Sequence, residues 1–157
     1  MDLTTAALVG ISHGTTSSDG QAAVRRLIDA VETSATARSA PAASTAAAPS
    51  AVRLGHVDVQ QPDVAATLGA LPPSTPAVVV PLLLSAGYHV HVDLRREIDD
   101  VADRSVRLAA ALGPDDRLVA VLRRRLDEAA ATPDDLVVLA VAGSSDARAV
   151  DDCRDMG

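Results

Sequence analysis

The sequence predicts an α/β fold, a doubly wound and mainly parallel sheet flanked by helices. Short apolar runs alternate along the chain with stretches whose apolar residues recur at helical spacing. The longest run, Ala77 to Leu84, is apolar without interruption, which is typical of a strand covered on both faces in a parallel sheet. A length of 157 residues is about one domain and suffices to bury a core.

The expected elements alternate along the chain. Strands are predicted where apolar residues run together, at 6–11, 52–59, 77–84, 106–110 and 136–142. Helices are predicted where a capping residue or proline opens an amphipathic stretch, from about 17–19 onward, from Pro62 to Pro72, at 93–103 and at 114–131. Residues 33–50 are almost entirely Ala, Ser, Thr and Pro, and this composition predicts a flexible connection.

A weak internal similarity suggests the domain organisation. Residues Ala7 to Thr15 resemble Val137 to Ser145, since both read as a strand followed by a small-residue turn. We therefore expect an α/β domain over 1–135, with its flexible segment at 33–50. Residues 136–157 are expected to be the start of a second, homologous half that is cut off.

Composition excludes several classes of function. Tyr88 is the only aromatic residue and the net charge is −7, so recognition of nucleic acid by base stacking or charge is not expected. Cys153 is the only cysteine, which excludes a cysteine metal cluster. The longest apolar run falls far short of the ~20 residues that span a bilayer, and the N-terminus lacks the basic start of a signal peptide. We expect a cytoplasmic protein that does not bind membranes.

All four histidines follow predicted strands or lie near their carboxyl ends, where an open parallel sheet binds its ligands. His13 follows the first strand, His56 and Asp58 lie near the end of the second, and His89 and His91 follow the third. Being two residues apart in a strand, His56 and Asp58 are expected on one face. We interpret His56 as a surface or sheet-face residue rather than a ligand, and rank His91 below His89.

These residue types suit a divalent metal. Neutral imidazole binds Fe(II), Co(II), Ni(II) and Zn(II), and a carboxylate completes a cationic site. Simpler roles stay open, because His13 also suits a helix cap or turn and Asp58 suits solvent or backbone amides. Residues 15–18, rich in Ser and Thr, suit an anion but lack a phosphate-loop pattern.

Three segments resemble the class II chelatases of the sirohydrochlorin cobaltochelatase and ferrochelatase type. A strand followed by His-Gly-Ser/Thr corresponds to Ser12–Thr15, and a Leu-Glu-x-x-x-Pro segment corresponds to Val57–Pro62. The third motif is a proline, three aliphatic residues, four further residues and a histidine. It corresponds to Pro81–His89, with Asp93-Leu94 downstream. The resemblance covers about Ala6 to Gly113.

The resemblance implies insertion of Co²⁺ or Fe²⁺ into a sirohydrochlorin-like tetrapyrrole, in cobalamin or siroheme biosynthesis. It implies His13 and His89 as metal ligands and catalytic residues, with Asp58 at the position of the family's glutamate. The implied residues around the tetrapyrrole are Gly14, Thr15, Gly87 and Tyr88. The metal is then a substrate, and no permanently bound cofactor is expected. The family's short forms dimerise, so a homodimer is also compatible with the resemblance.

Two alternatives compete with the chelatase. A non-catalytic module would bind metal or tetrapyrrole without turnover. A histidine phosphatase also places His-Gly after its first strand, but its mechanism needs an arginine directly before that histidine to bind phosphate. Ser12 occupies this position, which disfavours the phosphatase.

Overall fold

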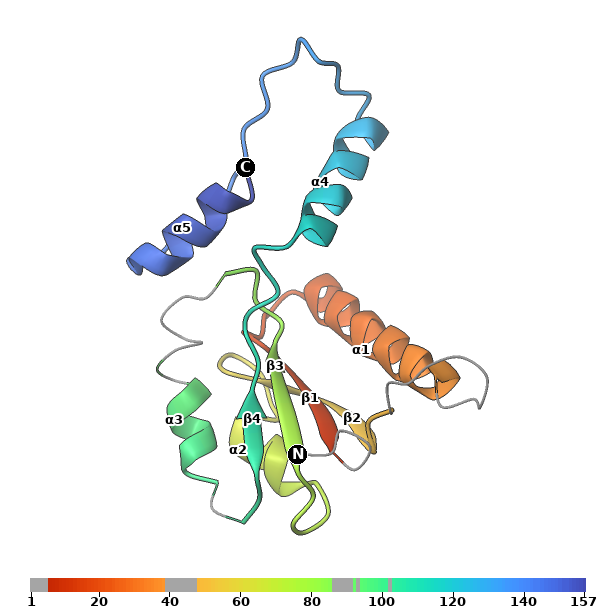
Figure 1. The fold of residues 1–157 in the computed structure, drawn as a ribbon, viewed down its shortest axis with the longest axis vertical. Helices are drawn as coiled ribbons and strands as arrows, with labels where there is room; N and C mark the ends of the chain where they lie inside the picture. Colours follow the sequence, from red (N-terminus) through yellow and green to blue (C-terminus); the bar gives the residue numbers. More distant parts are fainter. Residues whose placement is uncertain (1–5, 39–47, 86–91, 93, 102) are drawn as a thin grey trace.

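The computed structural model describes residues 6–38, 48–85, 92, 94–101 and 103–157. Its centre is a four-stranded parallel sheet in the order β2-β1-β3-β4 (Figure 1). The strands are β1 (Ala7–Ser12), β2 (Ala51–His56), β3 (Ala77–Pro81) and β4 (Val106–Leu108). The predicted α/β fold with a parallel sheet is confirmed.

Strand β1 lies inside the sheet, with β2 on one side and β3 on the other. From β1 the chain first moves outward to β2 and then returns across β1 to β3. The connections after β1 and β3 therefore leave in opposite directions. Such a switch point at the carboxyl ends of parallel strands is where doubly wound sheets bind ligands.

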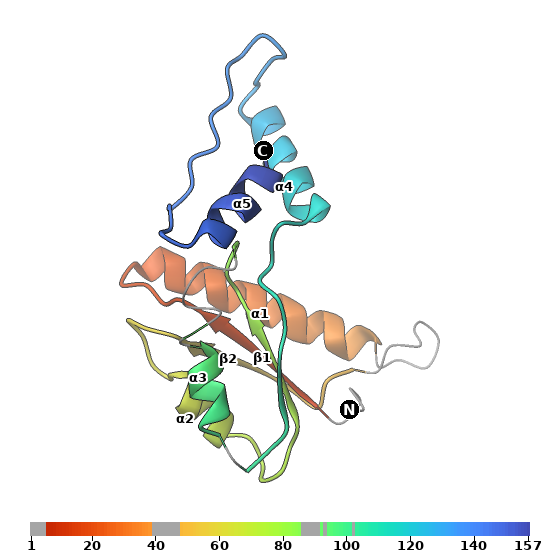
Figure 2. The same cartoon turned by 60° about the vertical axis from the view of Figure 1, so that its left-hand side comes forward.

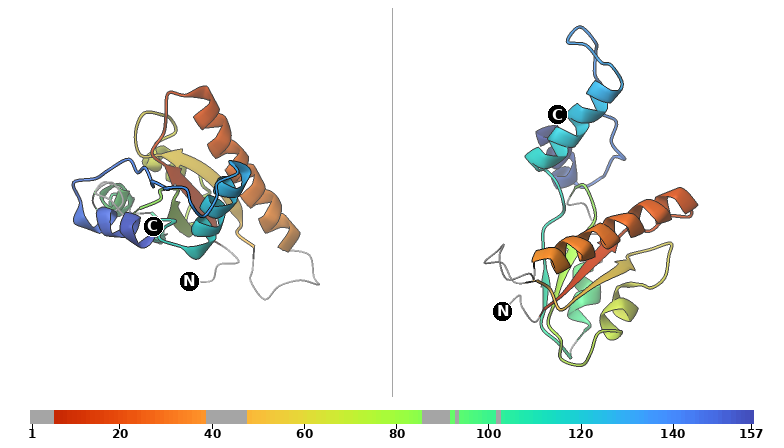
Figure 3. Two further views of the ribbon diagram at one scale, coloured as in Figure 1. Left: turned by 90° about the horizontal axis from the view of Figure 1, so that it is seen from above. Right: turned by 90° about the vertical axis from the view of Figure 1, so that its right-hand side faces the viewer.

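Helices cover both faces of the sheet. α1 (Ser18–Arg38) packs against β2 from one face, whereas α2 (Val64–Gly69) packs against β1 and β2 from the other and contacts α3 (Leu94–Asp99). Figures 1 and 3 show α1 on the opposite side of the sheet from α2 and α3. This division follows from right-handed crossovers, because reversing the direction of strand addition moves the connecting helix to the opposite face.

The core lies between the sheet and the pair α2 and α3. Its fully buried side chains come from alternate positions of β1 and β3 and from the inner faces of the two helices. The largest are Ile11, Leu68, Leu94, Val9, Val64 and Val79. All are aliphatic, as the near absence of aromatic residues requires.

Helix α1 corrects the predicted start of the flexible segment, because residues 33–38 are helical. Alanine has the highest helix propensity, and the threonines of this stretch satisfy their hydroxyls within the helix. The Thr33 and Thr36 hydroxyls donate to the carbonyls of Asp29 and Glu32, at 2.8 and 2.9 Å. Residues 39–47 of the predicted segment lie outside the described residues.

Several strands end earlier than the sequence suggested. β2 ends at His56 rather than at residue 59, because the chain bends at 57–61. β3 ends at Pro81, although Leu82 still donates its amide to the Ile11 carbonyl at 2.7 Å. The expectation that His56 and Asp58 share a strand face is therefore wrong, since Asp58 lies beyond the strand.

The predicted strand at 136–142 is also wrong, because no part of it is paired in a sheet among the described residues. Leu136 is 92% exposed and Val138 is 78% exposed. A strand forms only where neighbours accept its backbone hydrogen bonds, and no described strand lies beside this run. Two helices flank it, α4 (Asp116–Glu128) and α5 (Ala147–Asp155). Figures 1 and 2 show them beyond the carboxyl-terminal edge of the sheet.

Within the described ranges, no helix is both long enough and apolar enough to cross a membrane.

Candidate active site

His13 stands directly after β1, at the switch point of the sheet. Its side chain is exposed, whereas Ile11 and Ser12 before it are buried. The imidazole of His13 therefore lies at the surface, directly after the buried end of β1. This confirms the predicted position of His13 at the carboxyl edge and leaves its role to be argued from its surroundings.

The backbone joins the His13 turn to the segment after β2. Val57 donates its amide to the Ser12 carbonyl at 2.9 Å, and Asp58 donates its amide to the His13 carbonyl at 3.1 Å. These bonds continue the β1–β2 pairing beyond the two strands. The structure therefore brings together two of the three predicted catalytic residues, His13 and Asp58, through their main chains.

Gly14 fits this junction because it has no side chain. Its φ is +91°, in the region that favours glycine. A Cβ atom on Gly14 would lie 2.2 Å from the Asp58 carbonyl oxygen, which is far inside van der Waals contact. The glycine that follows His13 is thus required by the close approach of the two loops.

Two glutamines hold Thr15, and the sequence analysis did not identify either of them. Thr15 donates its amide to Gln60 Oε1 at 2.8 Å, and its carbonyl accepts from Gln21 Nε2 at 2.9 Å. Gln60 comes from the loop after β2 and Gln21 from the first turns of α1. Both bonds are to backbone atoms, so no motif in the sequence marks them.

The segment after β2 contains an unusual backbone conformation. Val59 has a φ of +61°, which is rare for a β-branched residue and costs energy. The Asp58 carboxylate accepts the Val59 amide at 2.7 Å, and the Gln60 amide donates to the Asp58 carbonyl at 2.6 Å. These bonds stabilise a tight turn that keeps the Asp58 side chain exposed beside the His13 turn.

His56 is a sheet-face residue but not a surface residue, so only the first half of the expectation "sheet-face or surface" is correct. It is 5% exposed, and its Nδ1 atom lies 2.8 Å from Ser12 Oγ. Burial lowers the pKa of His56 by desolvating the ring, and the positive charge of Arg25 lowers this pKa further. His56 is therefore a neutral, buried sheet-face residue at neutral pH.

The other predicted site residues, Gly87, Tyr88 and His89, lie outside the described residues, as does His91. Their segment follows β3, and the amide of Leu82 is bonded to the Ile11 carbonyl just before His13. In the ranges that are described, no three His, Cys, Asp or Glu side chains form a group that could hold a metal ion. His13 is thus not part of a closed ligand cage formed by described residues alone.

Comparison with known proteins decides the family. The family model described as CbiX matches residues 7–129, which is most of the chain and includes the whole sheet. The chain belongs to the CbiX family.

Similar proteins agree with this membership. The CbiX-family chain is 27% identical over 79 residues to a sirohydrochlorin cobaltochelatase of Sulfurisphaera tokodaii, covering 49% of this chain and 66% of that protein. Its fold resembles SirB from Bacillus subtilis with Fe³⁺, with a TM-score of 0.77 and 18% identity over 96% of this chain. It also resembles the sirohydrochlorin chelatase SirB of B. subtilis subspecies spizizenii in complex with cobalt, with a TM-score of 0.70, 16% identity and the same coverage. The chain spans 57% and 59% of those two structures.

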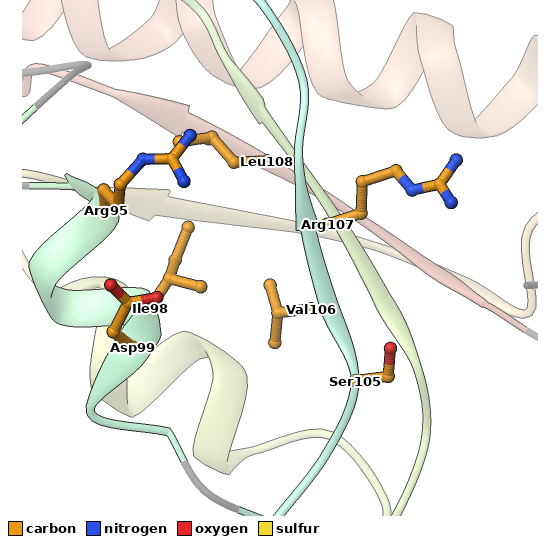
Figure 4. A pocket seen from close by; sticks show the side chains of 7 residues that line it. All are labelled: Arg95, Ile98, Asp99, Ser105, Val106, Arg107 and Leu108. Atoms are coloured by element: carbon orange, nitrogen blue, oxygen red, sulfur yellow. The ribbon is translucent and has the colours of Figure 1, made fainter.

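A pocket of about 340 Å³ lies elsewhere in this CbiX-family chain, between α3 and the edge strand β4 (Figure 4). It is lined by Arg95, Ile98, Asp99, Ser105, Val106, Arg107 and Leu108. None of the predicted site residues contributes to it. In Figure 4 the Arg107 side chain points away from the space between α3 and β4, so the two arginines do not converge on a ligand.

Proposed function

We propose that this protein is a sirohydrochlorin chelatase, a lyase-class enzyme that inserts Co²⁺ or Fe²⁺ into a sirohydrochlorin-like tetrapyrrole in cobalamin or siroheme biosynthesis. The observation that carries the proposal is the exposed His13 at the switch point of a CbiX-family sheet, with the Asp58 loop bonded to it. Two of the similar proteins, a sirohydrochlorin cobaltochelatase and the sirohydrochlorin chelatase SirB, support the same substrate.

In this proposal the metal ion is a substrate that His13 and His89 hold before transfer. Imidazole binds both Co²⁺ and Fe²⁺, so the ligands favour neither ion. His89 follows β3, the strand next to β1 on the other side of the switch point. A two-histidine site leaves coordination positions open, which is needed because the ion must exchange protein ligands for ring nitrogens.

Asp58 is proposed as the base. Metal insertion replaces two pyrrole N–H protons with one divalent cation, so the net charge of the macrocycle is unchanged. An exposed carboxylate next to the His13 turn can accept these protons one at a time and release them to water. Aspartate is one methylene shorter than the family's glutamate. The Asp58 carboxylate is held in place by a hydrogen bond from the Val59 amide, in the turn where Val59 has a positive φ.

The macrocycle is proposed to lie against the loops around His13. Exposed apolar side chains flank this edge, with Val59 at 52% exposure after β2 and Leu84 at 68% after β3. The apolar faces of a flat tetrapyrrole ring gain free energy by covering such side chains. Residues at the predicted contact positions are Gly14, Thr15, Gly87 and Tyr88.

The test is metal insertion followed by the visible spectrum of sirohydrochlorin, with Co²⁺ and Fe²⁺ compared in parallel. The full chain is expected to accelerate the spectral change, and His13→Ala is expected to remove most of the acceleration. Thr36→Ala, at the far end of α1, serves as the control that leaves the rate unchanged. Tight binding of metal or tetrapyrrole without acceleration would contradict the enzyme and support a non-catalytic binding module.

We also propose that residues 136–157 begin a unit whose sequence resembles that of β1 and α1, although 136–142 is not paired as a strand among the described residues. The same offset of 129 residues relates Gly14 to Gly143, both with positive φ, and relates the first residues of α1 and α5, Ser18 and Ala147. This alignment is shifted by one residue from the sequence similarity described above, which pairs Ala7 with Val137. It places Ala142 opposite His13, so the second unit would carry no equivalent imidazole.

A further inference from the structure

A buried polar pair lies under the His13 turn. Ser12 and His56 end their strands as direct neighbours in the parallel register of β1 and β2. Both side chains are buried, at 6% and 5% exposure. They lie on the sheet face covered by α1, because Gly10, two residues before Ser12, faces Ile28 of that helix.

The pair is connected to the turn by a second hydrogen bond. Ser12 Oγ lies 2.8 Å from His56 Nδ1 and accepts the Gly14 amide at 3.3 Å. In a neutral ring, the Nδ1 lone pair can accept the Ser12 hydroxyl proton, which turns an oxygen lone pair towards Gly14. The hydrogen bonds thus run in one direction, from the Gly14 amide to the Ser12 hydroxyl and from that hydroxyl to the His56 ring. They join the residues on either side of His13, which are Ser12 and Gly14, to His56.

We propose that His56 is a positioning residue, which orients the Ser12 hydroxyl and through it fixes the His13–Gly14 turn. The fixed turn holds the His13 ring in one orientation towards the metal ion. The metal part of this inference rests on the proposed function. The orientation of the turn does not, because it follows from the hydrogen bonds alone. Positioning partners of this kind typically change metal affinity by about 10–100-fold.

Two simpler roles fit the geometry less well. A metal ligand that must release its ion to a tetrapyrrole has to be reachable, whereas His56 is buried beneath the turn. A residue present only for packing has no need of a polar ring, since a well-packed apolar pair is at least as stabilising as a buried hydrogen-bonded one. The polar pair adds a fixed orientation of the Ser12 hydroxyl, which an apolar pair could not provide.

The test uses His56→Phe, which keeps a ring of similar size but removes the acceptor, and Ser12→Ala, which removes the hydroxyl. Both are expected to weaken Co²⁺ binding about 10-fold, measured from the cobalt absorption bands, and to expose the Gly14 amide to faster hydrogen exchange. His56→Asn supplies an acceptor near the Nδ1 position and is expected to restore most of both signals. If His56→Phe does not fold, Ser12→Ala and His56→Asn decide the question.

Thr67→Val is the matched control. Thr67 is also a buried polar residue, and its hydroxyl donates to the Asp63 carbonyl at 2.6 Å, on the opposite face of the sheet. Its loss is expected to cost stability without changing Co²⁺ affinity or the Gly14 amide. A folded His56→Phe variant with wild-type Co²⁺ affinity and wild-type Gly14 exchange would overturn the inference.

The two proposals fail in different ways. If His13→Ala binds Co²⁺ as the wild type does, the metal assignment is wrong. The positioning role is then judged on Gly14 exchange alone, which needs no metal: acceleration in His56→Phe supports it, and no change refutes it.

Discussion

At the scale of single residues, the candidate site depends on close contacts between backbones more than on clusters of side chains. Gly14, Thr15 and Asp58 are held by main-chain bonds or by glutamines bonded to the main chain. Such contacts orient an exposed imidazole without surrounding it. That suits a donor of metal, because the ion must be able to leave.

Gly14 and Gly143 provide a matched pair for testing this arrangement. Both have positive φ, but a Cβ atom on Gly14 meets the Asp58 carbonyl, whereas one on Gly143 meets nothing within 4 Å. Gly14→Ala is expected to cost about 3 kcal/mol or more, from backbone strain and the clash together. Gly143→Ala is expected to cost about 1–2 kcal/mol, from strain alone. Urea unfolding measures both, and equal losses would contradict the close approach of the two loops.

Sequence reasoning placed His13 correctly after the first strand, because a polar residue after a buried apolar run is visible in the pattern, but it put Asp58 inside the second strand rather than beyond it. It left open whether His56 lies at the surface or on a covered face of the sheet, since the alternation of a strand says on which face a residue lies but not what covers that face. The Ser12–His56 bond joins residues 44 apart in the sequence and appears only when β1 and β2 are placed side by side.

At the scale of elements, the parallel sheet was predictable because β1 and β3 are largely apolar runs and amphipathic stretches separate the strands. Helix ends were less predictable. The alanine-rich stretch at 33–38 has the composition of a linker, yet it also has high helix propensity and continues from a helix already formed. Propagating an existing helix costs far less than starting one, so the helix extends to Arg38.

This extension predicts the effect of glycine in the last turns of α1. Ala35→Gly is expected to cost about 1 kcal/mol, because glycine is that much less favourable than alanine inside a helix. Ala48→Gly, in irregular backbone before β2, is the comparison and is expected to cost clearly less. Circular dichroism during urea unfolding measures both. A cost for Ala35→Gly no larger than for Ala48→Gly would show that α1 ends earlier.

At the scale of the whole molecule, the hydrophobic core and the candidate site have different locations. The aliphatic core lies between the sheet and the pair α2 and α3, whereas the candidate site lies at the carboxyl edge of the strands. The arm of α4, 136–142 and α5 extends beyond that edge (Figures 1 and 2). Its run at 136–142 was predicted as a strand from apolarity alone, which says nothing about whether a neighbouring strand is present.

The core and the arm should therefore respond differently to mutation. Leu68→Ala is expected to cost 2–5 kcal/mol, as is usual for a fully buried leucine. Leu136→Ser is expected to change the unfolding free energy by less than about 0.5 kcal/mol, because the side chain is almost fully exposed. Urea unfolding of both variants is the measurement. A large loss in Leu136→Ser would mean that this leucine is buried in solution.

In the proposed function, His13 holds the metal ion at the switch point of the sheet. Anomalous scattering from cobalt, in a crystal of the full chain soaked with Co²⁺ and sirohydrochlorin, measures where the ion binds. We expect an ion about 2 Å from a ring nitrogen of His13, at the distance usual for imidazole on a first-row divalent metal. A fully occupied cobalt site that His13 does not touch would rule out His13 as a metal ligand.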